Sequence, residues 1–384
     1  MEHFFDWFET NKLWIYSCFE RLHSMPEAGF QEWNTSRFIA ETLEKHGWEV
    51  KRGFAQTAVL GVRRGKLPGP SVCLRADMDA LSFTIDGVER CVHACGHDAN
   101  MTQVLAVAAA AGDCEFPERG VFMILFQPCE EGMKGALAVA KSGVLDGVDY
   151  LLGTHLRAAS ELESGACPAI LHGAAVSARV RVYGKAAHGA RPREGINAVT
   201  AGAEIVTRVS RVEGKDETPF SIKATRFSTA PGSVNTIPAE TEVFFDLRAQ
   251  TNIRMDELKQ SLQDIANEVC AACGAKAEVE FMGGVPAAEV SPETMEAAAE
   301  AIRTVYGSEG LHEPIVTPGG EDFHFYTQQI PGLKATVLGF GAGMCGGLHD
   351  PNMTFEHEVL PTAAKTLATT VNILLNKRKG QSRT

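Results

Sequence analysis

The order of apolar segments along the chain constrains its fold more than any other feature. Up to about residue 172, helical patterns alternate with short apolar runs such as Val72–Leu74, Val121–Phe126 and Tyr150–Leu152. Short apolar runs are typical of buried strands. Their alternation with helices predicts a mostly parallel sheet that is covered by helices on both faces.

One of these helices can be bounded from the sequence. The segment Phe38–Leu43 places apolar side chains on one helical face. Asn34 and Thr35, which precede it, are residue types that cap helix starts, and Gly47 is typical of a helix end. We therefore expect Asn34 and Thr35 at the start of this helix and Gly47 just beyond its end.

From about residue 175 the pattern changes. Apolar and polar residues alternate over residues 176–183, as in a strand with one face in water. A helix, two strand-like runs, a second helix and a last strand then follow, at about 196–212, 220–228, 242–248, 255–269 and 277–282. The order β-α-β-β-α-β is the split βαβ unit of a ferredoxin-like sandwich.

After about residue 285 the alternation of helix and strand returns, and it ends in a helix near Leu360–Leu375. The predicted fold class is therefore α/β, with two domains. Residues 1–174 and 285–384 form an α/β domain with a mostly parallel central sheet. Residues 175–284 form an inserted ferredoxin-like α+β domain.

Composition and charge exclude several classes of partner. With 45% hydrophobic and 22% charged residues, the chain has the composition of a folded globular protein. Its net charge of −12, without a long run of Lys and Arg, indicates no nucleic-acid partner. No apolar run approaches the ~20 residues that span a bilayer, so no membrane partner is expected. The early acidic residues argue against a signal peptide, and ten scattered cysteines form no disulfide framework, so we expect a cytoplasmic protein.

Residues that can bind metals or carry protons gather at the ends of the predicted strands, where open α/β sheets place their sites. Asp77 and Asp79 follow one apolar strand, Glu130 and Glu131 another, and His155 a third. Further candidates stand before a helix or in a late loop: Cys95, His97, Asp98 and His349. Thiolate, imidazole and carboxylate together suit a zinc- or manganese-class cation, with the first two favouring zinc.

Each candidate also has an ordinary structural interpretation. Taken singly, Cys95 would be a small buried hydrophobic residue, and His155 a structural histidine. Glu130 and Glu131 would be a solvated pair at a helix start. Two adjacent carboxylates directly after a buried strand fit that interpretation poorly, because unpaired buried charge is costly. A metal on one carboxylate and a catalytic proton on the other would remove the cost.

Seven strings occur in order along the chain: RADMDAL, HACGHD, FQPCEEG, GTHL, AHGARPREGINAV, GGEDFHFY and LHDPNMTF. Together they resemble the metal-dependent aminoacylase and carboxypeptidase family, which includes hippurate hydrolase and the auxin-conjugate hydrolases. The strings SGACPAILHG and DLRAQTN make the chain most similar to the AmhX-type amidohydrolases of that family. The resemblance covers nearly the whole chain, and the motifs as a set are highly specific.

The resemblance implies a role for each candidate. Two divalent ions, of zinc, manganese or cobalt, would be bound by Cys95, His97, Glu131, His155 and His349, with Cys95 as a candidate bridge. Glu130 falls on the general base. The carboxylates Asp77, Asp79 and Asp98 would lie around the ligands and support them without binding the metal themselves.

In the inserted domain, the resemblance places an oxyanion-stabilising histidine at His188, which would reach into the site of the partner subunit of a homodimer formed through this domain. It places contacts to the substrate's free carboxylate at Asn235 and Arg248. Without the resemblance, His188 would be a surface-loop histidine and Arg248 a solvent-facing charge. The planar fork of Arg248 does suit a carboxylate.

Three positions depart from the family pattern. Asn100 stands where the family has a second histidine. We expect this change to alter the hydrogen bonds that support the ligands, without loss of the metal. Cys129 replaces an alanine before the glutamate pair, and a thiol there predicts sensitivity to oxidation or heavy metals. The motif around His349 varies within the family, so the arrangement of ligands there stays open.

We therefore expect a metal-dependent amidohydrolase that cleaves N-acyl amino acids, or small peptide-like conjugates, to a carboxylic acid and a free amino acid. A metal-bound water has its pKa lowered towards ~7, so Glu130 can take its proton and later deliver it to the leaving amine. Two alternatives stay open. One is a cysteine hydrolase using Cys95 with His97, and the other is a catalytically inactive relative that senses a small acid.

Overall fold

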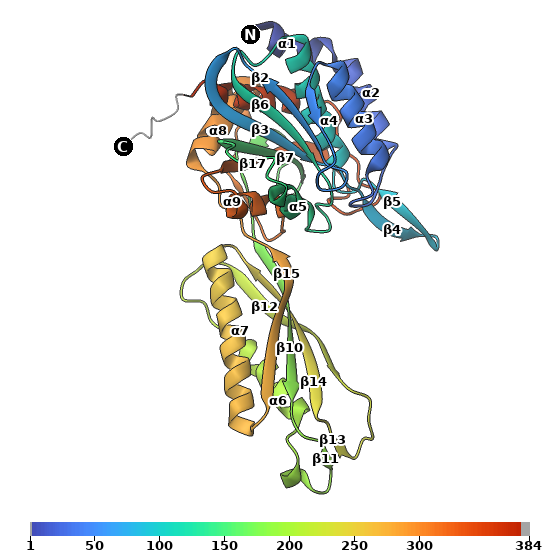
Figure 1. Ribbon diagram of the computed structural model, residues 1–384, viewed down its shortest axis with the longest axis vertical. Helices are drawn as coiled ribbons and strands as arrows, with labels where there is room; N and C mark the ends of the chain where they lie inside the picture. Colours follow the sequence, from blue (N-terminus) through green and yellow to red (C-terminus); the bar gives the residue numbers. More distant parts are fainter. Residues whose placement is uncertain (1, 378–384) are drawn as a thin grey trace. The chain divides into compact units, whose positions relative to one another are not determined.

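The computed structural model describes residues 2–377, which form two compact units (Figure 1). Unit 1 comprises the described residues within Met1–Leu171, Glu289–Ile315 and Asp322–Thr384. Unit 2 comprises His172–Ala288 and Val316–Glu321. The insertion predicted at 175–284 falls inside the longer segment of unit 2.

A seven-stranded sheet forms the centre of unit 1, with strand order β1-β2-β6-β3-β7-β17-β8. The strands are β1 (Glu49–Lys51), β2 (Val59–Arg64), β6 (Arg119–Gln127), β3 (Leu67–Asp77), β7 (Tyr150–Ala158), β17 (Lys334–Met344) and β8 (Ala166–Cys167). The four central strands, β6, β3, β7 and β17, run parallel, and the strands outside them pair antiparallel. The predicted α/β class is confirmed, with antiparallel pairing confined to the two sides of the sheet.

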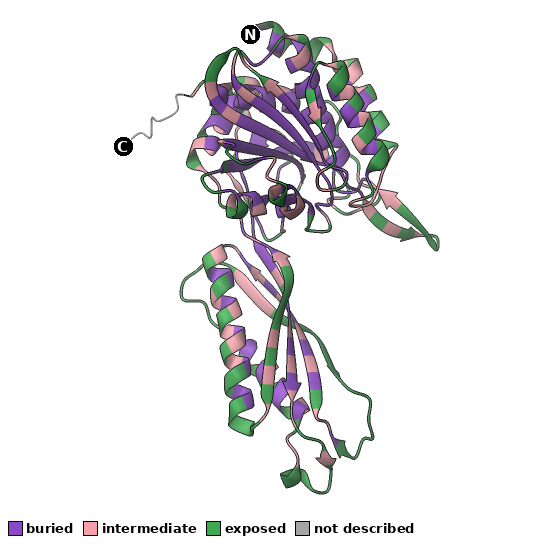
Figure 2. Cartoon of the chain, viewed as in Figure 1, coloured by how far each residue is buried: buried purple, intermediate pink, exposed green. Residues whose placement is uncertain are grey.

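Helices cover both faces of this sheet, as predicted. Val72 and Leu74 of β3 point to one face and Cys73 to the other, because successive strand side chains alternate. The first face packs against α1 (Glu2–Thr10), α2 (Lys12–His23), α3 (Trp33–Lys45), α4 (His97–Asp113), α8 (Pro292–Tyr306) and α10 (Val359–Leu375). The second packs against α5 (Gly135–Lys141) and α9 (Phe325–Gln329). The central strands are accordingly buried along most of their length (Figure 2).

The start of α3 differs from the prediction. The helix begins at Trp33, so Asn34 and Thr35 lie inside its first turn, and their side chains do not cap it. The N–H groups of a first turn have no partner within the helix. Here the Glu27 carboxylate accepts them from outside, at 3.0 Å from Asn34 N and 2.9 Å from Thr35 N. Gly47 follows the helix end with φ +74°, as expected.

Unit 2 contains a four-stranded antiparallel sheet of order β12-β14-β10-β15. Its elements follow the chain as β10 (Ala174–Tyr183), α6 (Ala198–Val209), β12 (Phe220–Thr229), β14 (Glu240–Ala249), α7 (Asn252–Cys273) and β15 (Lys276–Val285). This is the predicted β-α-β-β-α-β order. Val180 and Val182 of β10 pack on α6 and α7, while the residues that alternate with them, Arg179, Arg181 and Tyr183, are partly exposed.

The remaining elements are short. They are the strands β4 (Leu81–Ile85), β5 (Val88–Val92), β9 (Ile170–His172), β11 (Ala187–His188), β13 (Thr236–Ile237) and β16 (Ile315–Thr317), and the 3₁₀ turns Pro192–Glu194, Ser308–Gly310 and Asp322–His324. The β4–β5 hairpin extends away from the body of unit 1 (Figure 1).

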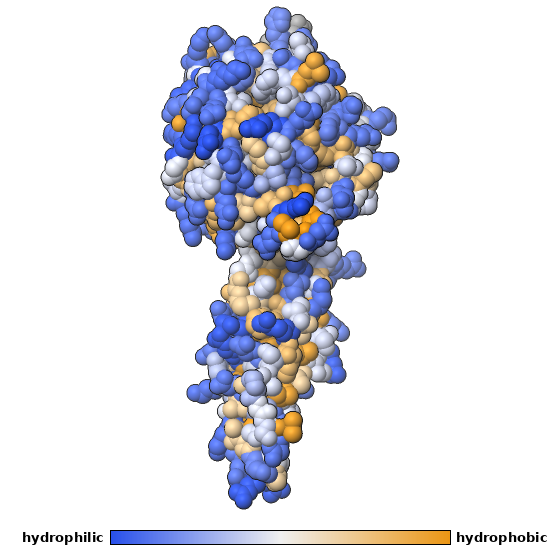
Figure 3. Space-filling view, turned by 90° about the vertical axis from the view of Figure 1, so that its right-hand side faces the viewer, coloured by the Kyte–Doolittle hydropathy of each residue, from blue (hydrophilic) through white to orange (hydrophobic). Residues whose placement is uncertain are grey.

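The face shown in Figure 3 carries hydrophobic groups scattered among polar and charged ones. Leu13, Val234 and Ile253 are among the exposed large hydrophobic residues. Among residues 2–377, no helix combines the length and the apolar composition that crossing a bilayer requires.

Candidate metal centre

The parallel strands of unit 1 bring the predicted residues to one edge of the sheet. Asp77 ends β3 and pairs with Gln127, which ends the neighbouring strand β6. The loops that follow these two strands carry Asp79 and the Glu130–Glu131 pair. The carboxyl edge of a parallel sheet is where such folds place their sites.

His155 comes from the next strand along the sheet, β7. The prediction that His155 follows its strand is wrong, because β7 continues to Ala158. The strand is longer than its apolar run because its last residues pair with β17, where His155 lies opposite Gly339. His155 therefore reaches the site from within a buried strand.

Cys95 and His97 stand at the start of α4. Gly96, between them, is the N-cap residue of the helix, with φ +80°, a conformation that glycine adopts without strain. The Cys95 Sγ atom lies 3.6 Å from Nε2 of His155. The turn into α4 therefore brings the two residues to the strand ends.

The ligand-type atoms form overlapping groups. Those of Cys95, His97 and His155 all lie within 4.8 Å of one another, and so do those of Cys95, Glu131 and His349. Cys95 belongs to both groups, which is the position a bridging ligand would occupy. His349 is the least buried member, with 57% of its side chain exposed, and its Nε2 lies 3.5 Å from Oε1 of Glu131.

Two buried atoms test whether these residues suit a cation. The Nδ1 atom of His97 is 2.8 Å from the backbone oxygen of Asp79, so its Nε2 is directed to the site. Within residues 2–377, neither His97 Nε2 nor Glu131 Oε1 has a hydrogen-bond partner, although both are buried. Unsatisfied buried polar atoms are costly. A divalent ion would satisfy both, so the residues fit one.

Burial and neighbouring charges shift the pKa values of these groups. Burial lowers the pKa of His155 to about 3 and so keeps its imidazole neutral, which is the form that binds metals. Burial raises the pKa of the Cys95 thiol, so thiolate ligation there depends on a cation. Burial also opposes charge on His97, but Asp77 and the Cys95 sulfur outweigh it and raise the pKa of His97 well above its usual value.

The predicted supporting carboxylates hold the site's backbone and side chains. Asp79 accepts the N–H of Glu130 at 2.9 Å and that of Glu131 at 3.1 Å. Asp77 accepts from the Arg75 guanidinium at 2.7 Å. Asp98 does not face the ligand atoms in this way. It bonds the His23 ring, with 2.6 Å between Oδ2 and Nδ1.

Two of the three departures from the family pattern, Asn100 and Cys129, have clear environments. Asn100 donates its side-chain N–H to Asp77 at 2.9 Å, so it supports the same carboxylate that faces His97. Cys129 is buried, and burial, helped by nearby carboxylates, raises the pKa of its thiol to about 12. A thiol that stays protonated reacts slowly. The structure therefore gives no support to the predicted sensitivity of Cys129.

The remaining predicted residues belong to unit 2. His188 is exposed in β11, and Asn235 accepts the N–H of Gly189 through its backbone oxygen at 2.7 Å. Arg248 lies near the far end of β14, where its Nε donates to Asp246 at 3.1 Å. At ~3.3 Å per residue, β14 separates Arg248 from the Asn235 end by about 26 Å. In one chain, therefore, Asn235 and Arg248 cannot bind the same carboxylate.

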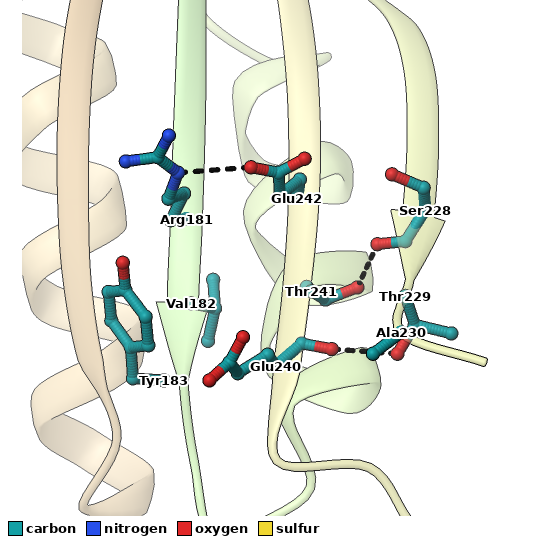
Figure 4. Close-up of a pocket in the computed structure, with 9 residues that line it drawn as sticks. All are labelled: Arg181, Val182, Tyr183, Ser228, Thr229, Ala230, Glu240, Thr241 and Glu242. Carbon is teal, nitrogen blue, oxygen red and sulfur yellow. Dashed lines mark hydrogen bonds and ion pairs between the residues drawn. The ribbon is translucent and has the colours of Figure 1, made fainter. Parts of the chain in front are cut away.

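Unit 2 also has a surface hollow of about 320 Å³ on β10, β12 and β14 (Figure 4). In it, Arg181 Nε donates to the Glu242 carboxylate at 3.0 Å. None of the predicted site residues is among the nine that line the hollow. It therefore plays no part in the candidate centre.

Sequence reasoning missed Glu32 and Thr57. Glu32 is fully buried and accepts hydrogen bonds from Thr57 Oγ1 and from the N–H of Cys129. Glu32 and Cys129 are 97 residues apart in the chain. A carboxylate bonded to a distant backbone group leaves no local sequence pattern.

Comparisons with known proteins find relatives over most of the chain. The model of "Peptidase family M20/M25/M40" matches residues 73–373. Thermostable carboxypeptidase 1 of Saccharolobus solfataricus is 32% identical over 83% of this chain and 84% of its own length. IAA-amino acid hydrolase ILR1-like 2 of Arabidopsis thaliana is 30% identical over 91% of this chain and 83% of its own. The Bacillus subtilis YXEP protein, described as a dinuclear metal binding peptidase, superposes with a TM-score of 0.82 at 24% identity, over 96% of this chain and all of that one.

Proposed function

The chain belongs to the peptidase family M20/M25/M40, a family of amide- and peptide-bond hydrolases, and on that premise we propose that it is a divalent-metal-dependent amidohydrolase. Its substrates are N-acyl amino acids or small peptide-like conjugates, which it cleaves to a carboxylic acid and a free amino acid. One observation carries the proposal. Two groups of ligand-type atoms share Cys95, and one of them includes Glu131, the residue next to Glu130.

The five ligands would hold two ions of zinc, manganese or cobalt. Cys95, which belongs to both groups, would hold them together with His97, Glu131, His155 and His349. When bound, such ions act as Lewis acids towards the amide carbonyl and lower the pKa of water in the site.

Glu130 is the group that moves the proton. Its carboxylate is almost fully buried, and its backbone N–H is fixed by Asp79 at 2.9 Å. It takes a proton from the attacking water and delivers it to the nitrogen of the leaving amine. Because the same residue accepts and returns the proton, no second acid is required.

The unit 2 residues act on the substrate's charges. His188 stabilises the oxyanion, and Asn235 and Arg248 bind the free carboxylate of the amino acid. These roles rest on the family's motifs. The length of β14 between Asn235 and Arg248 supports a homodimer formed through unit 2, because two chains can then supply the two residues to one substrate.

Two relatives support this substrate class, since one is named a carboxypeptidase and the other an IAA-amino acid hydrolase. We also place the protein in the cytoplasm, because all ten of its cysteines are free thiols, which suits a reducing compartment.

A hydrolysis screen tests the proposal. Acetyl, benzoyl, indole-acetyl and aminobenzoyl amino acids would be incubated with protein loaded with zinc, manganese or cobalt, and free amine release measured. We expect activity that EDTA abolishes and metal restores. Activity that survives exhaustive chelation but is lost in Cys95→Ser at full metal occupancy would instead indicate a cysteine hydrolase. Tight binding of these compounds without any amine release would indicate a sensor.

A further inference from the structure

The loop after β6 is held by two buried carboxylates. Three consecutive backbone N–H groups, those of Cys129, Glu130 and Glu131, point to carboxylate oxygens. Cys129 N donates to Glu32 Oε1 at 2.9 Å. Glu130 and Glu131 donate to the two oxygens of Asp79. Asp79 comes from the motif already described, whereas Glu32 comes from a segment that contributes no ligand.

Both oxygens of Glu32 are engaged. The second oxygen, Oε2, accepts the hydroxyl of Thr57 at 2.5 Å. Glu32 is the N-cap residue of α3, yet its side chain makes no capping hydrogen bond to that helix. Residues at this position usually bond their own helix. The side chain of Glu32 is directed to the loop instead, so a local role in α3 does not explain it.

The backbone of Gly29, three residues before Glu32, also lies close to Cys129. A Cβ added to Gly29 would lie 2.8 Å from Cys129 Sγ and 3.0 Å from its Cα, so this close approach requires glycine. Cys129 itself has φ +52°, a left-handed conformation that is strained for a side chain of its kind. Strained backbone persists only where its surroundings determine it. Glu32 and Gly29 supply those surroundings.

We propose that Glu32 is a positioning residue for the reaction. By holding the N–H of Cys129, it sets the place of the next two residues, the base Glu130 and the ligand Glu131. The proposal rests on the function proposed above for those two residues, but its physical basis is the hydrogen bond between Glu32 and Cys129. Thr57 orients the Glu32 carboxylate for that bond.

The test compares Glu32→Ala, Glu32→Gln and Glu27→Ala in the full chain. Glu27 is the matched control, because it lies in the same segment and accepts backbone N–H groups of α3 but none of the loop. In Glu32→Gln the amide oxygen can still accept from Cys129, while the amide N–H₂ can donate to Thr57. This variant should therefore rescue the loop.

Three readouts are measured. In metal-free protein, hydrogen exchange of residues 129–131 should be faster in Glu32→Ala only. Zinc affinity and kcat should each fall by about 10- to 100-fold in Glu32→Ala, with KM little changed. Glu32→Gln should stay near wild type in all three, and Glu27→Ala should lose thermal stability alone.

Wild-type exchange and zinc affinity in Glu32→Ala would overturn the proposal, and so would equal changes in Glu27→Ala. If Glu32→Ala does not fold, Thr57→Val is measured in its place. We expect its exchange, zinc affinity and kcat to change in the same direction. If none of the three changes, the proposal is overturned. If the wild-type protein hydrolyses no N-acyl amino acid, the proposed function fails, while hydrogen exchange and zinc affinity still decide the role of Glu32.

Discussion

The adjacent residues Glu130 and Glu131 have different neighbours and different proposed roles. Glu131 belongs to a ligand group with Cys95 and His349, and its Oε1 has no hydrogen-bond partner in the described chain. Glu130 lies next to it and is nearly fully buried. In the proposed function, Glu131 therefore binds a cation and Glu130 exchanges a proton.

Replacing Glu130 by glutamine should separate these roles. Glu130→Gln keeps the shape of the side chain but cannot accept the proton, so kcat should fall by about 100- to 10,000-fold. Metal content, measured by mass spectrometry, should match the wild type. In the control variant Glu131→Gln, metal binding should weaken instead. A Glu130→Gln enzyme with near wild-type kcat would contradict the assigned role.

A second prediction at this scale concerns pH. Burial, with the nearby Arg75 charge, lowers the pKa of His324 to about 3, against about 6.5 in the unfolded chain. Between these two pKa values, His324 is therefore protonated in the unfolded state and neutral in the folded state. The stability that depends on neutral His324 is present above pH 6.5 and is lost as the pH falls below it, by about 2 kcal/mol between pH 7 and pH 5.

Urea unfolding at pH 7 and pH 5 checks this prediction. His324→Gln should lose less stability between the two pH values than the wild type, because glutamine does not titrate. An equal loss in both proteins would show that His324 does not contribute.

The sequence identified individual site residues only where their side-chain types carry the chemistry. Paired carboxylates after a strand pointed to Glu130 and Glu131, and a thiol and an imidazole before a helix pointed to Cys95 and His97. Glu32 was not found, because its role depends on a backbone group 97 residues away. Asn100 was noticed as a departure, but only the structure shows that it donates to Asp77.

At the scale of elements, periodicity predicted the main helices and strands of unit 2 and the apolar strands β3, β6 and β7 of unit 1, but not how the elements begin and end. The N-terminal caps expected for α3 were wrong, because the carboxylate of Glu27, which precedes the helix, accepts the N–H groups of Asn34 and Thr35. The β4–β5 hairpin was missed although its signal was present. Asp86 and Gly87 both have positive φ, which is the two-residue Asp-Gly turn typical of hairpins.

A core substitution tests the packing of α7. Leu262 is fully buried between α7 and the sheet of unit 2. Leu262→Ala should lower the free energy of unfolding by about 2–5 kcal/mol, through lost burial and the cavity left behind. Chemical unfolding measures the change. Gln260→Ala, on the exposed side of the same helix, should change it by less than about 0.5 kcal/mol, and an equal effect would contradict this packing.

At the scale of the whole molecule, pattern alone could predict two domains but not the order of their strands. In unit 1, β17 from the last part of the chain lies between β7 and β8. In unit 2, β10 lies between β14 and β15. Such pairings join strands that are distant in the sequence. The periodicity within one segment does not predict which strand it will pair with.

The proposed homodimer can be tested by mixing two inactive variants. If His188 and Arg248 serve one substrate from different chains, neither His188→Ala nor Arg248→Ala is active alone. A mixed dimer of the two has one site with both residues intact. Refolding an equal mixture should therefore restore roughly a quarter of the wild-type activity.

Each variant refolded alone is the control for this experiment, and sedimentation measures the size of the species. No gain on mixing, with dimers present, would contradict the sharing of residues between chains. A monomer at assay concentration would contradict the dimer itself.

The division of the chain also bears on the order in which the protein can fold as it leaves the ribosome. The long segment of unit 2, His172–Ala288, is continuous and emerges before the second part of unit 1. The sheet of unit 1 must wait for β17, and the candidate ligand His349 comes only after that strand. During synthesis, unit 2 can fold while the first 171 residues still lack the strand that joins β7 to β8. The candidate metal centre therefore cannot be complete before His349 has been made, and a nascent chain that stalls before β17 would carry Cys95, His97, Glu131 and His155 without that residue.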